Sequence, residues 1–392
     1  MNTLEVKYDR PFEHFKEPIS YQKFENCMKR NIPCSFGKWI SYGWNSRTSW
    51  VLDDGQPNFD FLEENYGSFS ASVTKFSSNN DFDCISQTIS QFISYWKSII
   101  LERAPSNNHK FESFPVADYH TLPHYLKDWH FAMNTDPSSV YFVPDIFADD
   151  WLNRFWRARG DIDDDYIFSY FGPTGSFTPF HADVFRSYSW SINVCGRKKW
   201  LILYPGEESK LDCNSLNIEE QCTSLGLKYE VVIQNEGEGI FVPSGWWHQV
   251  LNTADTISIN HNWANFHCVP RMWKYLTSEL ELVEEEISDC RHLMTDLEWD
   301  KQCQVVLRAN IGISFMEFVE FVLFNLNIHS QDEYKKFISE IDKKQNEDIL
   351  SKLTKTHYDY EAYNKIHEMF YSNRDIVEFL KAIITEIKSV EH

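Results

Sequence analysis

The middle of the chain alternates between short apolar runs and Gly, Pro or Asn, a pattern that is typical of closely spaced β-strands. Between residues 111 and 270 we expect strands over 166–171, 189–194, 199–203, 229–233, 239–242, 248–251 and 256–260. So many short strands predict an all-β barrel or sandwich for this region. The polar segment 206–228 is expected to be an insertion between two of these strands.

The two ends of the chain have a different periodicity. Residues 1–110 mix helical patterns, at 24–30 and 84–101, with polar loops. Beyond residue 270 apolar side chains recur every three or four residues, which predicts amphipathic helices. The recurring positions are Leu276, Leu280, Val283 and Ile287, a stripe of Phe315, Phe318, Phe321, Val322 and Phe324, and a final set of Ile376, Leu380, Ile383 and Ile387.

These changes divide the chain into three predicted parts and give an α+β fold. Residues 1–110 form a mixed N-terminal flank, residues 111–270 a β-rich domain, and residues 271–392 a C-terminal helical domain. The helical tail is apolar enough that it could also serve as a homodimer interface.

Composition narrows the class of partner and the location. The chain carries 37 basic and 58 acidic residues, a net charge of −21. Because affinity for nucleic acid rests on Lys and Arg neutralising phosphates, we expect no nucleic-acid partner, and a cationic partner is favoured. We also expect no membrane span and no secretory signal. The nine cysteines form no C-x-x-C pair, which favours a reducing, cytoplasmic location that leaves room for a nuclear fraction.

Candidate metal ligands lie in two segments of the β-rich region. The first segment contains His181-Ala182-Asp183, and the second contains His248 behind two tryptophans. Two imidazoles and one carboxylate can bind one face of Fe(II) and leave its other positions open. Residues two apart share one face of a strand, so we predict that His181, Asp183 and His248 form a catalytic iron site. The alternative for His248 is a packed core histidine.

An open iron site needs an electron source, and a dicarboxylate co-substrate would supply one. Its far carboxylate requires a buried cation, because an unpaired buried charge is prohibitive. Lys198 is the candidate, and Thr178, three residues before His181, could add a hydroxyl donor. The alternative is that Lys198 and Lys199 form a solvated strand edge.

Together these residues resemble a known family. The patterns T-x-x-H-x-D (178–183), G-x-K (196–198) and G-x-x-x-F-V-P-x-G-W-W-H (237–248) are similar to those of the JmjC group of iron(II)- and 2-oxoglutarate-dependent oxygenases, and matching blocks span about 110 to 320. The resemblance implies a double-stranded β-helix core of jelly-roll or cupin type, Fe(II) as cofactor, and 2-oxoglutarate and O2 as co-substrates. It assigns metal binding to His181, Asp183 and His248.

The resemblance also extends to the co-substrate contacts. It assigns 2-oxoglutarate binding to Lys198 and Thr178, to Tyr125 in YLKDWH, and to Asn260 near the last core strand. Some relatives have an Asn five residues before the glycine of G-x-K, and this chain has Ser191 there. The details of the co-substrate contacts therefore differ from those relatives.

A narrower resemblance concerns the substrate. The blocks FHADVFRSYSWSINVCGRKKW (180–200) and DTISINHNW (255–263) are similar to a JmjC subfamily of lysyl hydroxylases. That likeness implies hydroxylation of a lysine side-chain carbon in the eukaryotic class 1 translation release factor. Two alternatives are a histone lysine demethylase, although such enzymes usually carry zinc-finger readers, and a non-catalytic JmjC-like scaffold, which the intact ligand set argues against.

Overall fold

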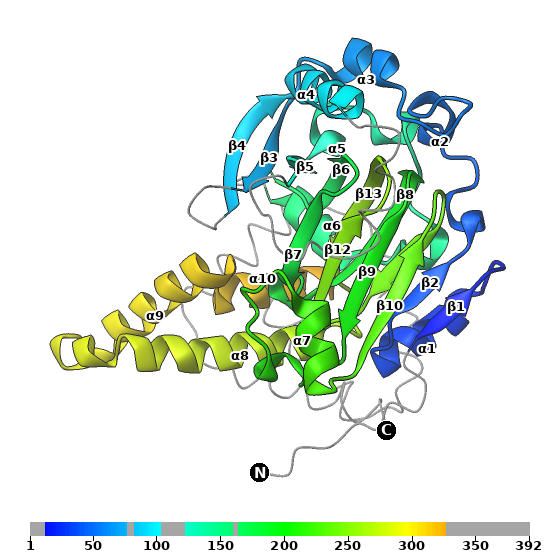
Figure 1. Ribbon diagram of the computed structural model, residues 1–392. Coiled ribbons are helices and arrows are strands. Elements are labelled where there is room, and N and C mark those ends of the chain that lie inside the picture. Colours follow the sequence, from blue (N-terminus) through cyan, green and yellow to red (C-terminus); the bar gives the residue numbers. More distant parts are fainter. Residues whose placement is uncertain (1–11, 77–81, 103–121, 160–163, 327–392) are drawn as a thin grey trace. The chain divides into compact units, whose positions relative to one another are not determined.

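Two β-sheets form the core of the computed structural model, which describes residues 12–76, 82–102, 122–159 and 164–326. Within these residues the larger sheet has the order β1 (Glu13–Phe15), β2 (Cys34–Phe36), β11 (Gly239–Val242), β8 (Tyr188–Cys195), β13 (Thr256–Trp263), β6 (Ile167–Gly172), β5 (Tyr125–Trp129), β3 (Ser70–Phe76) and β4 (Phe82–Thr88). The smaller sheet has the order β10 (Tyr229–Gln234), β9 (Lys198–Leu203), β12 (His248–Asn252) and β7 (Phe177–His181), and Figure 1 shows its strands side by side.

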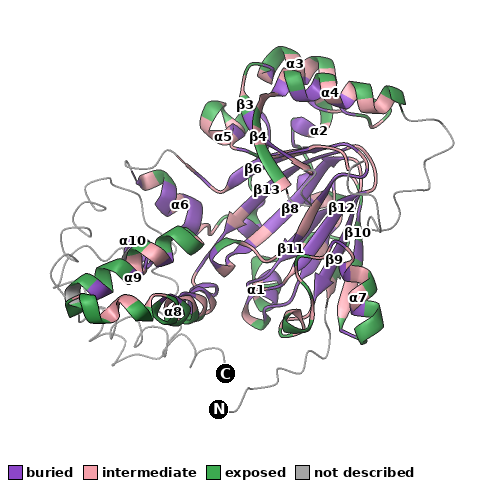
Figure 2. Cartoon of the chain, turned by 60° about the vertical axis from the view of Figure 1, so that its left-hand side comes forward, coloured by how far each residue is buried: buried purple, intermediate pink, exposed green. Residues whose placement is uncertain are grey.

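The two sheets face each other. β9 and β12 are buried at every position, which Figure 2 shows as continuous purple along β12 and much of β9. Lys198 on β9 reaches across to Ser191 on β8 and to Ser258 on β13. Strands that are buried on both faces usually have near-continuous apolar sequences, and the polar residues of β9 and β12 are therefore candidates for a functional site. The predicted double-stranded β-helix is therefore confirmed, and each of the seven expected strands is present within two or three residues of its expected bounds.

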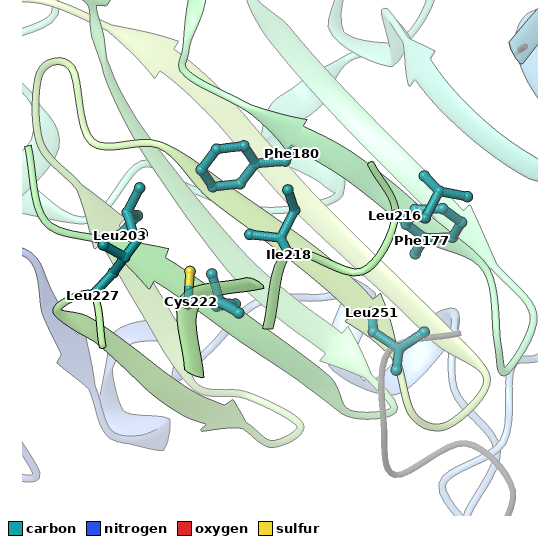
Figure 3. Close-up of a cluster of buried hydrophobic side chains, with 9 residues drawn as sticks. Phe177, Phe180, Leu203, Leu216, Ile218, Cys222, Leu227 and Leu251 are labelled. Atoms are coloured by element: carbon teal, nitrogen blue, oxygen red, sulfur yellow. The ribbon is translucent and has the colours of Figure 1, made fainter. Parts of the chain in front are cut away.

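The insertion between β9 and β10 is more ordered than its polar sequence indicates. It contains a 3-10 turn, η6 (Glu208–Lys210), and the helix α7 (Ile218–Leu225). Ile218 and Cys222 lie four residues apart on one face of α7, and both are fully buried. With Leu216 they pack against Phe177, Phe180, Leu203 and Leu251 of the smaller sheet (Figure 3). The insertion therefore covers the outer face of the sheet that carries the candidate site.

The N-terminal flank contributes strands as well as helices. Its helices are α1 (Tyr21–Arg30), α2 (Ser46–Ser49), α3 (Phe59–Tyr66), α4 (Ile89–Glu102) and, beyond residue 110, α5 (Phe131–Asn134). The expected helix over 84–101 is wrong in its first part, because residues 82–88 form β4. This strand pairs with β3 from Ser70↔Thr88 to Phe76↔Phe82, and that pairing outweighs the local helical pattern. The flank thus extends the larger sheet at both ends.

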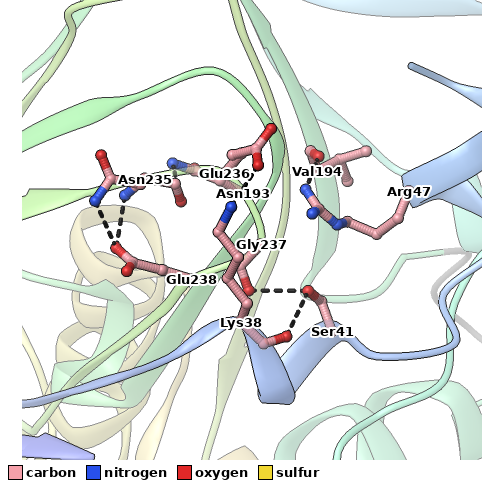
Figure 4. Close-up of polar contacts among 9 residues, drawn as sticks. All are labelled: Lys38, Ser41, Arg47, Asn193, Val194, Asn235, Glu236, Gly237 and Glu238. Atoms are coloured by element: carbon pink, nitrogen blue, oxygen red, sulfur yellow. Dashed lines mark hydrogen bonds and ion pairs between the residues drawn. The ribbon is translucent and has the colours of Figure 1, made fainter. Parts of the chain in front are cut away.

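A polar clamp from the flank holds the turn that leads from β10 in the smaller sheet to β11 in the larger one (Figure 4). Ser41 Oγ donates to the Gly237 carbonyl at 2.8 Å, and Lys38 pairs with Glu236. Arg47 Nη1 donates to the Val194 carbonyl at 2.6 Å. Gly237 has a φ of +73°, and a Cβ there would lie 2.9 Å from Arg47 Nη2, so glycine is required.

A second compact unit comprises residues 149–165, 184–187 and the chain from 263 onward. Its described helices are α6 (Trp151–Ala158), α8 (Val269–Glu286), α9 (Asp296–Ile311) and α10 (Phe315–Asn325). The predicted apolar stripe lies on α10, where Phe318, Phe321 and Phe324 are buried. Phe321 packs on Phe155 at 5.7 Å between ring centroids. The helical prediction is confirmed here, and the homodimer interface stays a prediction.

Several boundaries and motifs lie outside the described residues. These are the division at residue 110 and the final set of apolar positions at 376–387. The division at residue 270 lies in the first turn of α8. No helix in the described ranges combines the length and apolarity that crossing a membrane requires.

We predict that Leu201→Ala lowers the free energy of unfolding by about 2–5 kcal/mol, because Leu201 is fully buried under α7 and truncation leaves a cavity. Val231, its register partner on β10, is 43% exposed and provides the matched control. Urea unfolding of Leu201→Ala and Val231→Ala measures the difference. Equal destabilisation by both substitutions would contradict the burial that we describe.

Candidate active site

Three side chains from two distant segments of the chain meet at the end of the smaller sheet. His181 is the last residue of β7 and His248 is the first residue of β12, and the two are direct register partners. Their ring centroids lie 4.3 Å apart. With Asp183 they offer three ligand atoms that all lie within 4.8 Å of one another. The structure therefore brings together all three residues that the sequence predicts as metal ligands.

Asp183 lies after the end of β7, whereas its spacing from His181 predicted a position on the strand. The expectation that His181 and Asp183 share one face of a strand is wrong, because β7 ends at His181 and the chain turns directly after Asp183. Two hydrogen bonds hold the carboxylate: Ser189 Oγ donates to Oδ2 at 2.7 Å, and Asn262 Nδ2 donates to Oδ1 at 2.9 Å. These donors orient Asp183 and leave lone pairs on both oxygens.

The imidazoles are prepared for metal binding. His181 Nδ1 donates to the Pro179 carbonyl at 2.8 Å, and His248 Nδ1 donates to the Trp246 carbonyl at 3.1 Å. A carbonyl only accepts, so each Nε2 keeps its lone pair for a metal. Burial, and next the neighbouring His248, lower the pKa of His181, which keeps its ring neutral. Two neutral imidazoles and one carboxylate are a donor set that fits Fe(II).

Lys198 is a buried cation without a counter-charge. It is only 2% exposed, and its Nζ donates to Ser258 Oγ at 2.7 Å and to Ser191 Oγ at 3.3 Å. In the described part of the chain, no carboxylate lies within ion-pair distance of it. Burial lowers the pKa of Lys198 to about 7. The site therefore fits a ligand that brings its own carboxylate, as 2-oxoglutarate does.

The side chain of Lys199 lies on the opposite face of β9 from that of Lys198. Its Nζ lies 2.8 Å from Glu219 of α7, on the covered outer face of the smaller sheet. The alternative that both lysines form a solvated edge is therefore wrong, since both are buried.

The other predicted co-substrate residues form two linked groups. Asn260 Nδ2 donates to Ser258 Oγ at 3.0 Å, so Asn260 connects to Lys198 through that hydroxyl. Tyr125 is 3% exposed, and the side chains of Asn252 and Thr178 lie near its hydroxyl. Burial raises the pKa of Tyr125, so the phenol stays protonated. Ser191, at the position where some relatives have Asn, accepts from Lys198.

Sequence reasoning missed two residues that join these groups. The Tyr170 ring centroid lies 5.8 Å from Lys198 Nζ and 5.9 Å from the Tyr125 ring centroid. Asn252 is the register partner of Lys198, its Nδ2 donates to Ser176 Oγ at 2.9 Å, and its side chain lies near the Tyr125 hydroxyl. A Cβ on Gly172 would lie 2.1 Å from Asn252 Nδ2, so this close approach requires glycine. Nothing local in the sequence marks Tyr170 or Asn252, because their role depends on strand register.

Ser258, Ser189 and Asn262 were missed as well. Strand alternation places Ser258 on the same face as Asn260, so this one residue had a usable signal in the sequence.

Sequence comparisons agree with this geometry. The family described as "JmjC domain, hydroxylase" matches residues 168–263. A two-sheet core that carries a two-histidine, one-carboxylate cluster beside a buried lysine is that of a JmjC-domain oxygenase.

Relatives extend the similarity well beyond the core. "2-oxoglutarate and iron-dependent oxygenase JMJD4" of Homo sapiens is 41% identical over 324 residues, which cover 78% of this chain and 73% of that protein. The Drosophila melanogaster JMJD4 homolog is 35% identical, over 77% of this chain and 74% of its own length. "Arginine-specific demethylase JMJ20" of Arabidopsis thaliana is 34% identical, over 78% and 67%. The chain belongs to the JMJD4 family of 2-oxoglutarate and iron-dependent oxygenases.

The enzyme thus depends on iron and 2-oxoglutarate. When bound, these groups supply the oxidising power that places one oxygen atom of O2 in a substrate C–H bond and the other in succinate. His181, Asp183 and His248 would hold the metal. Lys198 would hold the far carboxylate, with Tyr125 and Thr178 as hydroxyl donors. Trp200, which stacks on His248 at 5.5 Å, covers one side of the cluster and limits access of water.

We predict that His181→Ala and Asp183→Ala abolish 2-oxoglutarate turnover while the proteins remain folded, because each substitution removes one of three ligands. Succinate release and the iron content of the purified proteins measure the effect. His292→Ala, at an exposed histidine, is the control. Full succinate release by either folded ligand variant would rule out this iron site.

We predict that Lys198→Met raises the KM for 2-oxoglutarate by about a hundredfold or more, since it leaves a buried carboxylate unpaired. Initial rates of succinate release over a range of 2-oxoglutarate concentrations measure this. Lys199→Met, one residue away on the outer face, is the matched control and should leave the KM unchanged. A similar KM for both variants would refute the role of Lys198.

Proposed function

We propose that this enzyme hydroxylates a side-chain carbon of a lysine in the eukaryotic class 1 translation release factor. The observation that carries the proposal is the extent of the similarity to JMJD4 proteins. It covers 324 residues, whereas the JmjC match covers only 168–263. The similarity therefore includes segments that flank the catalytic core as well as the core itself. The blocks at 180–200 and 255–263 support the same subfamily.

In this proposal the site residues bind the co-substrate and position it relative to the substrate. The metal ligands and Lys198 would fix the co-substrate, so that the substrate must approach from the side that these residues leave open. The net charge of −21 favours a basic protein loop over an acidic one. The proposal places the enzyme in the cytoplasm, where the release factor acts, with a nuclear fraction and a homodimer through its C-terminal helices as further parts of it.

Demethylation is the second candidate. One observation favours it: the Arabidopsis relative at 34% identity carries the name of an arginine-specific demethylase. One observation weighs against a histone demethylase that carries a zinc-finger reader domain. Across the described ranges, His181, Asp183 and His248 are the only His, Cys, Asp and Glu group placed to hold a metal ion. In the described ranges, which include all nine cysteines, no disulfide joins them.

Mass spectrometry separates the candidates. We predict that the enzyme, incubated with Fe(II), ascorbate, 2-oxoglutarate and the release factor, adds the mass of one oxygen atom to one lysine-containing peptide. The His181→Ala protein is the control and should add nothing. Loss of the mass of a methylene from a methylated histone or arginine peptide would favour demethylation instead. Neither product, with no succinate release, would support the non-catalytic scaffold.

A further inference from the structure

An acidic residue next to the site has an unusual backbone conformation. Asp128 on β5 has a φ of +57°, in the left-handed region that non-glycine residues rarely adopt. It lies in an irregularity of the β5–β6 ladder between Leu126 and Trp129. Bulges of this kind redirect a side chain and often occur beside active sites, and local strain of this kind often marks a functional position.

The bulge directs Asp128 to Tyr170. Tyr170 lies on β6 between the register partners of Leu126 and Trp129, so it is opposite the bulge. Its hydroxyl donates to Asp128 Oδ1 at 3.0 Å. The same tyrosine ring is 5.8 Å from Lys198 Nζ. A single side chain therefore connects Asp128 to the co-substrate site.

The remaining surroundings of Asp128 leave it free for a ligand. The residue is exposed, and within the described ranges no basic side chain lies at ion-pair distance from it. Oδ1 accepts from the Tyr170 hydroxyl, and no other side chain or backbone group in the same ranges donates a hydrogen bond to the carboxylate. Tyr125, which belongs to the co-substrate group, is three residues earlier on the same strand. Asp128 is thus linked through Tyr170 to the co-substrate residues and is not one of the three candidate metal ligands.

We propose that Asp128 binds the ammonium group of the substrate lysine and so determines specificity for a cationic side chain. This inference rests on the proposed function, because it takes the target to be a lysine carbon. When a chain carbon is the reacting atom, the ammonium group extends past the metal and needs a carboxylate to one side. When an N-methyl group is the reacting atom, the nitrogen itself must lie at the metal. The place of Asp128 fits the first geometry.

One substitution removes the charge of Asp128 with little change in structure. Asn tolerates the left-handed region about as well as Asp and can still accept from Tyr170, so Asp128→Asn removes the charge and retains the local structure. Asp53→Asn, at an exposed aspartate in the N-terminal flank, is the matched control. Thermal unfolding of both variants checks that the fold is kept.

The test uses the Mn(II)-loaded protein with 2-oxoglutarate and two probes, Nα-acetyl-lysine amide and its uncharged analogue, Nα-acetyl-norleucine amide. Paramagnetic broadening of the side-chain protons of each probe reports binding near the metal. We expect the wild-type and Asp53→Asn proteins to prefer the lysine probe by about tenfold, as for a charge pair that is partly shielded from water. Asp128→Asn should bind the two probes about equally.

Two results would overturn the inference: equal binding of both probes by the wild-type protein, or a lysine preference that Asp128→Asn retains. The release-factor assay tests the proposed function separately, so failure of that function can be distinguished from failure of the role of Asp128. If the wild-type enzyme hydroxylates the factor while Asp128→Asn keeps its lysine preference, the proposed function stands and the role of Asp128 is wrong. If the factor is unmodified while Asp128→Asn loses the preference, the role of Asp128 stands and the substrate is wrong.

Discussion

The candidate co-substrate site depends on one ammonium group that is buried without a counter-charge. Lys198 lies on the inner face of β9, and its only described hydrogen-bond acceptors are two neutral hydroxyls, which come from the facing sheet. Burial lowers its pKa from 10.5 to about 7, which corresponds to about 5 kcal/mol against the charged form. A ligand carboxylate would relieve this penalty, so the same burial that destabilises the charged lysine would favour the binding of 2-oxoglutarate.

The metal cluster depends on the same two sheets. The pairing of β7 with β12 places His181 directly opposite His248, and Asp183 is fixed by donors from β8 and β13 of the larger sheet. The relative position of the sheets is therefore part of the site. Two segments outside the core stabilise it: α7, which covers the outer face of the smaller sheet, and the polar clamp of Lys38, Ser41 and Arg47 at the turn between the sheets.

Local sequence predicted the features that have a local cause. Alternation and turn residues located the core strands, the H-x-D spacing located two ligands, and the buried-charge argument located Lys198. Features that depend on register could not be predicted. Asn252 acts because it is opposite Lys198, and Asp128 is directed by a bulge against β6. Residues 82–88 form a strand through pairing with β3, although their pattern indicated a helix. In each of these cases the deciding partner is distant in sequence.

Proton uptake on co-substrate binding tests the central claim most directly. Calorimetric titration of 2-oxoglutarate into the Mn(II)-loaded protein, at about pH 8 and in buffers of different ionisation enthalpy, measures the number of protons taken up. Since the pKa of Lys198 is about 7 in the free protein, most of it is neutral at that pH and must be protonated to pair with a carboxylate. We predict uptake of nearly one proton per ligand, and that Lys198→Met removes it. A binding enthalpy that does not depend on the buffer would contradict the account.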